Sequence, residues 1–169
     1  MANSNRTEIY IEGSKEAIDN FVERFEKCHS GPYPNQEENP HIIDEFGAKA
    51  ELLIDRIGSK WVKIYDEGYY RSSDNRCEIY LDSAWYPPSD MILEIYRKMA
   101  EFDDEIKVSG KYWDEGYQPI GVFEVYYGEI ISEEQDIDDD EDQEYFWDDV
   151  IEPTFDKLQE KLDKVMREI

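Results

Sequence analysis

Apolar and polar residues alternate along several short segments of this chain, and this alternation predicts a β-sheet. In the first segment Thr7, Ile9 and Ile11 share one side, and Gly13 ends the strand. Four later segments also alternate, and a polar turn at residues 68–75 lets the second strand pair antiparallel with the third. The predicted strands are residues 7–12, 61–66, 77–82, 106–112 and 122–130.

Two other segments repeat apolar residues at the i, i+3, i+4 and i+7 spacing of an amphipathic helix. The first helix is predicted over residues 14–27 with Ser14 as its N-cap, and Ser89 caps the second directly after Pro87 and Pro88. The apolar positions are Ile18, Phe21, Val22 and Phe25 in the first helix and Ile92, Ile95, Tyr96 and Met99 in the second.

These elements predict one α+β domain over residues 1–130. Between the first two strands, residues 29–40 are rich in proline and polar side chains and predict a loop. Residues 50–57 predict a short helix that ends at Gly58. The resulting order places two helices on one face of an antiparallel sheet, which is a sandwich of the ferredoxin-like kind.

The remaining residues, 131–169, predict an acidic segment followed by a C-terminal amphipathic helix. Pro153 stands at a first helical position. Apolar residues then recur at heptad spacing for about two repeats, fewer than the three or four that a coiled coil needs. Two interpretations stay open: the helix packs on its own domain, or it pairs with another chain, including a second copy through residues 153–169. The apolar positions are Phe155, Leu158, Leu162, Val165 and Ile169.

Composition adds a strong negative charge to this picture. The formal net charge is -25, and residues 129–149 hold twelve acidic side chains with no Lys or Arg. Such a surface repels nucleic acid and anionic lipid and attracts basic partners. Hydrophobic residues make up 40% of the chain and aromatic residues 14%, which is too much for a disordered acidic tail. We therefore expect a folded domain with a packed core and a negatively charged surface.

The amount of charge is comparable with that of DNA. A compact chain of this length has a diameter of about 40 Å, so its net charge corresponds to about one charge per 1.6 Å. Duplex DNA carries one charge per about 1.7 Å of axis. Two interpretations remain, because the charge serves either solubility or mimicry of nucleic acid. The 13 Tyr are likewise open to two interpretations, as sheet-forming residues or as a contact surface.

Sequence motifs for catalysis or cofactor binding do not emerge. His29 and His41 lie in or beside the Pro-rich loop, and with Cys28 and Cys77 they lack zinc-ligand spacing. Residues 136–140 copy the first ligands of an EF-hand loop, but Glu141 replaces its required Gly and Trp147 its required Glu. We expect a protein that is not an enzyme and holds no cofactor or metal.

The same survey predicts where the protein resides and what it does not bind. The two cysteines, the lack of an apolar leader and the lack of a long apolar run predict a soluble protein of the cytoplasm, with no membrane contact. Tyr80, Tyr126 and Trp113 are strand aromatics of the kind that stack on RNA bases. They stand among acidic residues with no basic stripe, so direct nucleic-acid binding is disfavoured.

Three motifs carry a resemblance to a known family. They are Gly47-Ala48-Lys49 with Gly58-Ser59-Lys60-Trp61, then Ser83-Ala84-Trp85-Tyr86-Pro87-Pro88, then Tyr112-Trp113-Asp114-Glu115-Gly116 with Gly121 and Gly128-Glu129. Over about residues 6–130 the chain resembles the YubB-like, ferredoxin-like domain family of plasmids and phages. The resemblance implies the fold, a place for Trp61 and Trp85 in or beside the core, and a setting in mobile elements. It implies no catalytic residues, and the acidic C-terminal extension departs from the family.

Setting and charge together suggest a function. Mobile elements carry small acidic proteins that occupy nucleic-acid grooves of host defence proteins, as anti-CRISPR and anti-restriction DNA mimics do. We therefore expect a non-catalytic inhibitor that binds a basic surface of a host protein such as a Cas effector or a restriction enzyme. The alternative is an assembly protein that acts through its C-terminal helix.

The predicted contact residues of the inhibitor are acidic residues that replace phosphates and three aromatic residues that anchor the contact. The acidic residues are Glu133, Glu134, Asp136, Asp138, Asp139, Asp140, Glu141, Asp142, Glu144, Asp148 and Asp149, and the aromatic residues are Tyr145, Phe146 and Trp147.

Overall fold

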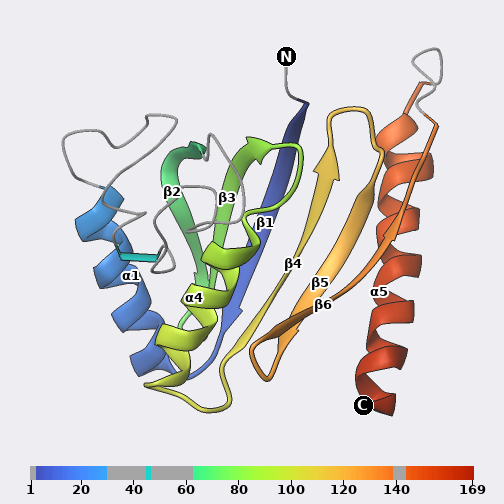
Figure 1. Cartoon of the computed structure of the whole chain (residues 1–169). Helices are drawn as coiled ribbons and strands as arrows, with labels where there is room; N and C mark the ends of the chain where they lie inside the picture. The colour runs from blue at the N-terminus through green and yellow to red at the C-terminus, as the bar shows by residue number, and fades with distance from the viewer. Residues whose placement is uncertain (1–2, 30–44, 47–62, 139–143) are drawn as a thin grey trace.

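The computed structural model describes residues 3–29, 45–46, 63–138 and 144–169, which build a six-stranded sheet with helices on both faces (Figure 1). The strands are β1 Ser4–Glu12, β2 Lys63–Ser73, β3 Arg76–Ala84, β4 Lys107–Asp114, β5 Ile120–Tyr126 and β6 Glu129–Gln135. The helices are α1 Lys15–His29, α4 Ser89–Ala100 and α5 Glu152–Glu168, with a π-helical turn at Trp147–Ile151 directly before α5.

The strand order is β2-β3-β1-β4-β5-β6, and all neighbouring strands pair antiparallel. The α+β class predicted from the sequence is confirmed. The first four strands, α1 and α4 follow the order β-α-β-β-α-β, which agrees with a ferredoxin-like arrangement. β5 and β6 extend the sheet beyond that unit, and the ferredoxin-like name itself stays a prediction.

The first face of the sheet carries α1 and α4, as the helical spacing predicts. Ile9 and Ile11 of β1 are fully buried beneath these helices, together with Phe21 and Phe25 of α1 and Ile95 of α4. Alternate residues of the strands and one stripe of each helix therefore form a single core. This follows from the period of two along strands and of 3.6 along helices.

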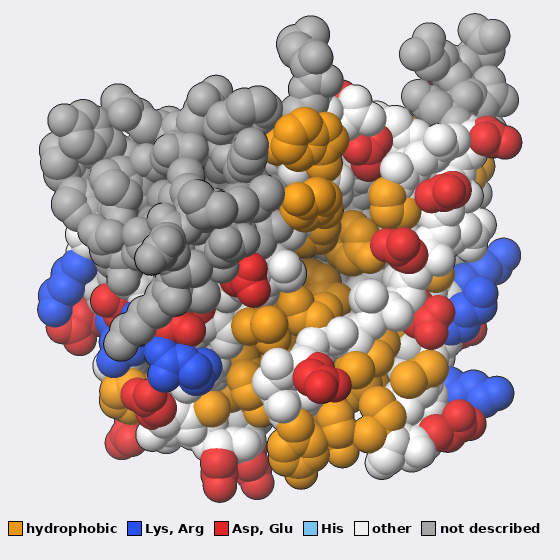
Figure 2. All heavy atoms as spheres, viewed as in Figure 1, with side chains coloured by type: hydrophobic (Ala, Val, Ile, Leu, Met, Phe, Trp, Pro, Cys, Tyr) orange, Lys and Arg blue, Asp and Glu red, His pale blue; other side chains and the backbone are white. Residues whose placement is uncertain are grey.

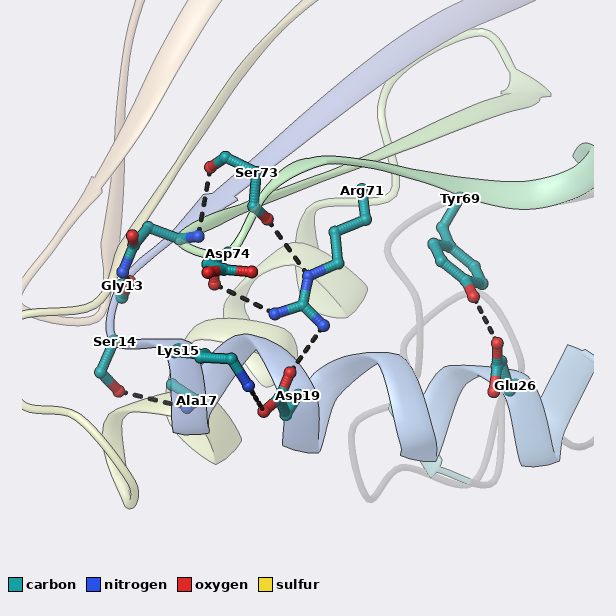
Figure 3. A network of polar contacts seen from close by, with 11 residues as sticks. Gly13, Ser14, Lys15, Ala17, Asp19, Glu26, Tyr69, Arg71, Ser73 and Asp74 are labelled. Atoms are coloured by element: carbon teal, nitrogen blue, oxygen red, sulfur yellow. Dashed lines mark hydrogen bonds and ion pairs between the residues drawn. The ribbon is translucent and has the colours of Figure 1, made fainter.

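Polar contacts hold the start of α1 against the β2–β3 hairpin (Figure 3). The Ser14 hydroxyl accepts a hydrogen bond from the Ala17 amide at 3.1 Å, so the predicted N-cap is present. Arg71 of β2 pairs with Asp19 at 2.6 Å and donates to the carbonyl oxygens of Ser73 and Asp74 at 3.1 Å each. The hydrogen bonds from Lys15 and Arg71 lower the pKa of the Asp19 carboxyl.

Two local predictions on this face were wrong. Ser89 is the first residue of α4 rather than its cap, because Pro88 occupies the N-cap and provides no capping side chain. Residues 68–73 belong to β2 rather than to a polar turn, because β2 pairs with β3 up to Ser73. The predicted helix at 50–57 and Trp61 lie outside the described residues.

The predicted strand at 122–130 is in fact a hairpin. β5 ends at Tyr126, the chain turns at Tyr127 and Gly128 with φ of 46° and 80°, and β6 returns along β5. Positive φ at both central residues is the geometry of a tight hairpin turn. The boundary predicted at residue 130 therefore falls inside β6.

The second face carries α5, which covers β5 and β6 (Figure 1). Strand β5 is buried on both sides: Phe123 and Val125 join the core under α1 and α4, while Ile120 and Val122 join a second cluster under α5. The structure therefore has three layers at this end of the sheet. In the part of the chain described above, no helix has an apolar stretch long enough to cross a membrane.

Candidate functional site

The acidic segment, residues 129–149, includes the edge strand β6. The structure describes its residues 129–138, which are β6 and the three residues after it, and its residues 144–149, which enter the π-helical turn before α5 (Figure 1). Seven of its described carboxylates belong to exposed residues, and that of Glu133 belongs to a half-buried one. The seven are Glu129, Glu134, Asp136, Asp138, Glu144, Asp148 and Asp149. Asp139, Asp140, Glu141 and Asp142 lie outside the described residues.

None of the carboxylates described in the acidic segment takes part in an ion pair. All ion pairs among the described residues join side chains within residues 6–124, which precede the acidic segment. The segment holds twelve of the 43 acidic residues, which leaves 31 against all 18 Lys and Arg elsewhere. The negative charge of its described carboxylates is thus not compensated by ion pairs with other described residues.

Glu133 and Glu134 point to opposite faces of the sheet. Glu133 pairs with Val122 of β5, which faces α5. Glu134 pairs with Gly121, which in turn pairs with Tyr112 of β4, so these three residues form one row on the other face. The Tyr112 hydroxyl donates a hydrogen bond to Glu134 Oε2 at 2.7 Å across Gly121. Burial raises the pKa of Tyr112, and the bond to Glu134 raises it further.

The three aromatic residues of the acidic segment do not act alike. Trp147 packs with ring centroids 5.2 Å from Trp113 and 6.2 Å from Phe155, and Phe146 lies 5.6 Å from the Tyr117 ring. Both belong to the cluster beneath α5. Tyr145 is 65% exposed, so it is the member of the triplet whose ring is most accessible to a partner.

The apolar seam of α5 is used inside the molecule. Phe155, Leu158 and Leu162 are 5%, 1% and 0% exposed against β5 and β6. Val165 is half-buried and Ile169 is exposed. The first of the two interpretations of this helix, packing on its own domain, therefore describes the structure.

A second candidate site lies on the face that carries α4, where a cavity of about 210 Å³ opens between α4 and β6. We call it the aromatic pocket. Figure 2 shows hydrophobic side chains in a hollow along the middle of this face, with Lys and Arg toward its left and right borders. The lining residues are Asn5, Trp85, Tyr86, Pro87, Ser89, Ile92, Tyr112, Pro119, Phe123, Ile130, Ser132 and Glu134.

Two glycines let aromatic rings form the floor of the aromatic pocket. A Cβ atom at Gly121 would overlap the Tyr112 ring, and one at Gly110 would lie 2.7 Å from Phe123 Cζ. Each ring therefore lies across a glycine of the neighbouring strand. The rings themselves are 6.4 Å apart between centroids. Because both glycines lack side chains, the rings can lie flat against the sheet beside the Glu134 carboxylate.

Trp85 and Tyr86 form the rim of the aromatic pocket and are 45% and 46% exposed. The sequence placed Trp85 in or beside the core, and its partial exposure puts it at the edge. Its φ is 66°, in the left-handed region. This conformation costs a bulky residue about 1–3 kcal/mol, so the surrounding bonds must impose it. The Trp85 amide donates to the Asn3 carbonyl at 2.8 Å, and the Ser83 hydroxyl donates to the Tyr86 carbonyl at 2.7 Å.

Asn5 adds a polar group to the wall of the aromatic pocket. Its side chain is fully buried, and its Oδ1 accepts a hydrogen bond from the Thr7 hydroxyl at 3.2 Å. Its Nδ2 has no acceptor among the described residues. A buried donor without an acceptor costs about 1–3 kcal/mol, and buried polar groups of this kind call for an explanation.

The aromatic residues considered for nucleic-acid binding are largely engaged elsewhere. Trp113 is covered by Trp147 and Phe155 beneath α5. The Tyr80 hydroxyl donates to the Glu78 carboxylate at 3.3 Å. Burial, followed by the nearby carboxylates, raises the pKa of Tyr80 to about 12. The Glu78 carboxylate at this hydroxyl is itself 3.7 Å from Arg76 Nη2, so the cation beside the ring is already paired.

Metal-binding clusters and reactive thiols are the two kinds of chemical site that can be checked in the described part of the chain. Groups of three or more His, Cys, Asp or Glu close enough to hold a metal ion do not occur there. Cys77 is buried, and burial raises the pKa of its thiol to about 12, which disfavours the reactive thiolate.

Sequence reasoning missed the aromatic pocket. The motif that contains Trp85, Tyr86, Pro87 and Pro88 predicts the fold and indicates no binding site. The other residues come from β1, β4, β5 and β6, and no spacing along the chain connects them. The signal that the sequence offers is a pair of adjacent aromatic residues directly before a predicted helix.

No family model, no curated protein and no solved structure matches this chain. The likeness to the YubB-like family therefore stays a resemblance carried by its motifs, and the function rests on the molecule's own surface.

Proposed function

We propose that this chain is a non-catalytic inhibitor that engages a basic, nucleic-acid-binding surface of a host defence protein, such as a Cas effector or a restriction enzyme. The acidic segment would occupy the groove in place of nucleic acid. The observation that carries the proposal is the charge clustered in residues 129–149, of which the described carboxylates form no ion pair with described residues. Negative charges that are not neutralised by a nearby cation are those that a basic surface can attract from a distance.

The fold supports this proposal by placing part of the charge on regular secondary structure. Glu129, Glu133 and Glu134 stand on β6, which pairs with β5 along its length. Asp148 and Asp149 stand on the turn fixed by Trp147 beneath α5. Preorganised charges lose little conformational entropy on binding. Phe146 and Trp147 serve the fold, so Tyr145 and the carboxylates are left as the contact residues that we propose.

The alternative function, assembly through the C-terminal helix, has lost its main support. Its argument was the apolar seam of Phe155, Leu158 and Leu162, and this seam is buried within the same chain. What remains exposed on α5 alternates acidic and basic residues, which is typical of a solvated helix surface.

The test is binding to purified Cas effectors and restriction enzymes over a salt series. A D136N/D148N/D149N variant removes three exposed charges of the acidic segment. An E16Q/D104N/E105Q variant removes the same number of exposed charges elsewhere. We expect affinity to fall as salt rises and to fall more in the first variant than in the second, and we expect the partner's nucleic acid to compete. Salt-independent binding, or equal losses in the two variants, would contradict the proposal.

A further inference from the structure

The aromatic pocket has the composition of a site for an organic cation. Four aromatic side chains line it, from Trp85, Tyr86, Tyr112 and Phe123, together with the Glu134 carboxylate. Among the residues that the structure describes, the lining contains no Lys or Arg. Aromatic faces attract ammonium and guanidinium groups, and this attraction grows when the cation is desolvated.

Glu134 gives the aromatic pocket a fixed negative charge. The Tyr112 hydroxyl, 2.7 Å from Oε2, holds the carboxylate on the pocket side of the sheet. In the described structure Glu134 lies in no ion pair, so its charge is open to an incoming cation. A hydrogen bond between two charged groups is shorter and stronger than one between neutral groups.

Two further features indicate that the pocket is more than a packing gap. Trp85 holds its ring at the rim from a left-handed backbone conformation, and such strain clusters at ligand sites. Asn5 lines the wall with an amide whose Nδ2 has no acceptor among the described residues.

We propose that the aromatic pocket binds the cationic end of one Lys or Arg side chain of the partner protein. This deepens the proposed function and rests on it, because the partner is taken to be basic. The cavity of about 210 Å³ is smaller than the roughly 300 Å³ at which pockets for drug-sized ligands begin, so its size suits one side chain. The cation lies among the aromatic rings and pairs with Glu134, and the peptide backbone passes the rim beside Trp85.

The direct test uses small peptides at constant ionic strength. Ac-Gly-Arg-Gly-NH2 and Ac-Gly-Lys-Gly-NH2 carry the cation, and the citrulline peptide is nearly isosteric with the arginine peptide but uncharged. We expect the cationic peptides to shift the Trp85 indole resonance and to bind about tenfold or more tightly than the citrulline peptide. Equal binding of arginine and citrulline peptides would overturn the proposal, and so would tighter binding of tetramethylammonium chloride, which would indicate a site for free quaternary ammonium.

Two pairs of variants locate the interaction. E134Q and E133Q remove the same charge from neighbouring residues on opposite faces of the sheet. W85G and Y127G remove exposed aromatic rings from positions of positive φ, and Trp85 lines the pocket whereas Tyr127 does not. We expect E134Q and W85G to weaken peptide binding about tenfold, and E133Q and Y127G by less than about twofold. Similar effects within either pair would refute the assignment.

The outcome is separable from that of the proposed function. If the E134Q and W85G variants bind the partner with wild-type affinity and the binding still weakens as salt rises, the pocket assignment fails and the acidic-surface mechanism stands. If cationic peptides bind the pocket but no nucleic-acid-binding protein is captured, the pocket assignment stands and the proposed function fails.

Discussion

Replacing Leu162 with Ala tests whether α5 is a fixed layer of this protein. The Leu162 side chain is fully buried in the cluster beneath α5, beside Leu158 at 1% exposure. Truncating a buried Leu removes its transfer free energy and leaves a cavity, which together cost about 2–5 kcal/mol. A shift of about 2–4 °C per kcal/mol for a chain of this size predicts a melting temperature lower by about 4–20 °C. The complete burial of Leu162 favours the upper half of that range.

The assay is thermal and urea unfolding of the wild type, L162A and the control K161A. Lys161 is the exposed neighbour of Leu162 on the same helix, so K161A should change stability by less than about 0.5 kcal/mol. Mass in solution is measured in parallel. If L162A matched K161A in stability and instead reduced the mass of an oligomer, the seam of α5 would face another chain, and the packing described above would be refuted.

Three other predictions follow from individual contacts. The G121A substitution should destabilise the fold by about 1–3 kcal/mol in urea unfolding, because its Cβ overlaps the Tyr112 ring; an unchanged midpoint would contradict the close contact. Cys77, whose pKa burial raises to about 12, should resist iodoacetamide at pH 8.5 in the folded protein and react in urea, as peptide mapping can show; equal rates would mean that the thiol is accessible. Tyr80 has a pKa raised to about 12 against 10.0 unfolded, so its stabilising contribution is complete below pH 10 and is lost as the pH rises toward 12. Between pH 9 and pH 11.5 the free energy of unfolding should therefore fall less for Y80F than for the wild type. Identical pH profiles of the two proteins would argue against the raised pKa of Tyr80.

Much of the first core was predictable because its elements repeat with a single period. Ile9 and Ile11 alternate along β1, and Phe21 and Phe25 lie one helical turn apart on α1. Ser14 also caps α1 as its position before the helix suggests. In each case the local preference of the residues and their burial in the fold agree.

The hairpin between β5 and β6 was not predictable in the same way. A tight turn with positive φ at both central residues usually carries Asn or Asp before Gly. Here Tyr127 takes the first position, so Gly128 alone marks the turn. β5 also contributes apolar residues to both faces, from Ile120 to Val125, and the two Tyr that follow lead into the turn without an Asn, Asp or Pro that would mark it.

The acidic segment was found from charge alone, but the roles of its aromatic residues were not. Phe146 and Trp147 pack on Tyr117 and Trp113, which lie about thirty residues earlier in the chain. Contacts over such separations leave no periodic trace. The same reason explains why Glu134 was counted with the phosphate-like charges, whereas it lies beside Tyr112 in the aromatic pocket.

The double burial of β5 has a consequence for how this protein can be divided. A fragment that ended at residue 130 would keep β5 but lose most of its partner strand. Its Ile120 and Val122 would then face water, and its free edge would offer a row of unpaired amides to other copies. Such a fragment should precipitate rather than behave as a minimal domain. The C-terminal residues thus act as a cover that protects the sheet from self-association, whatever else they bind.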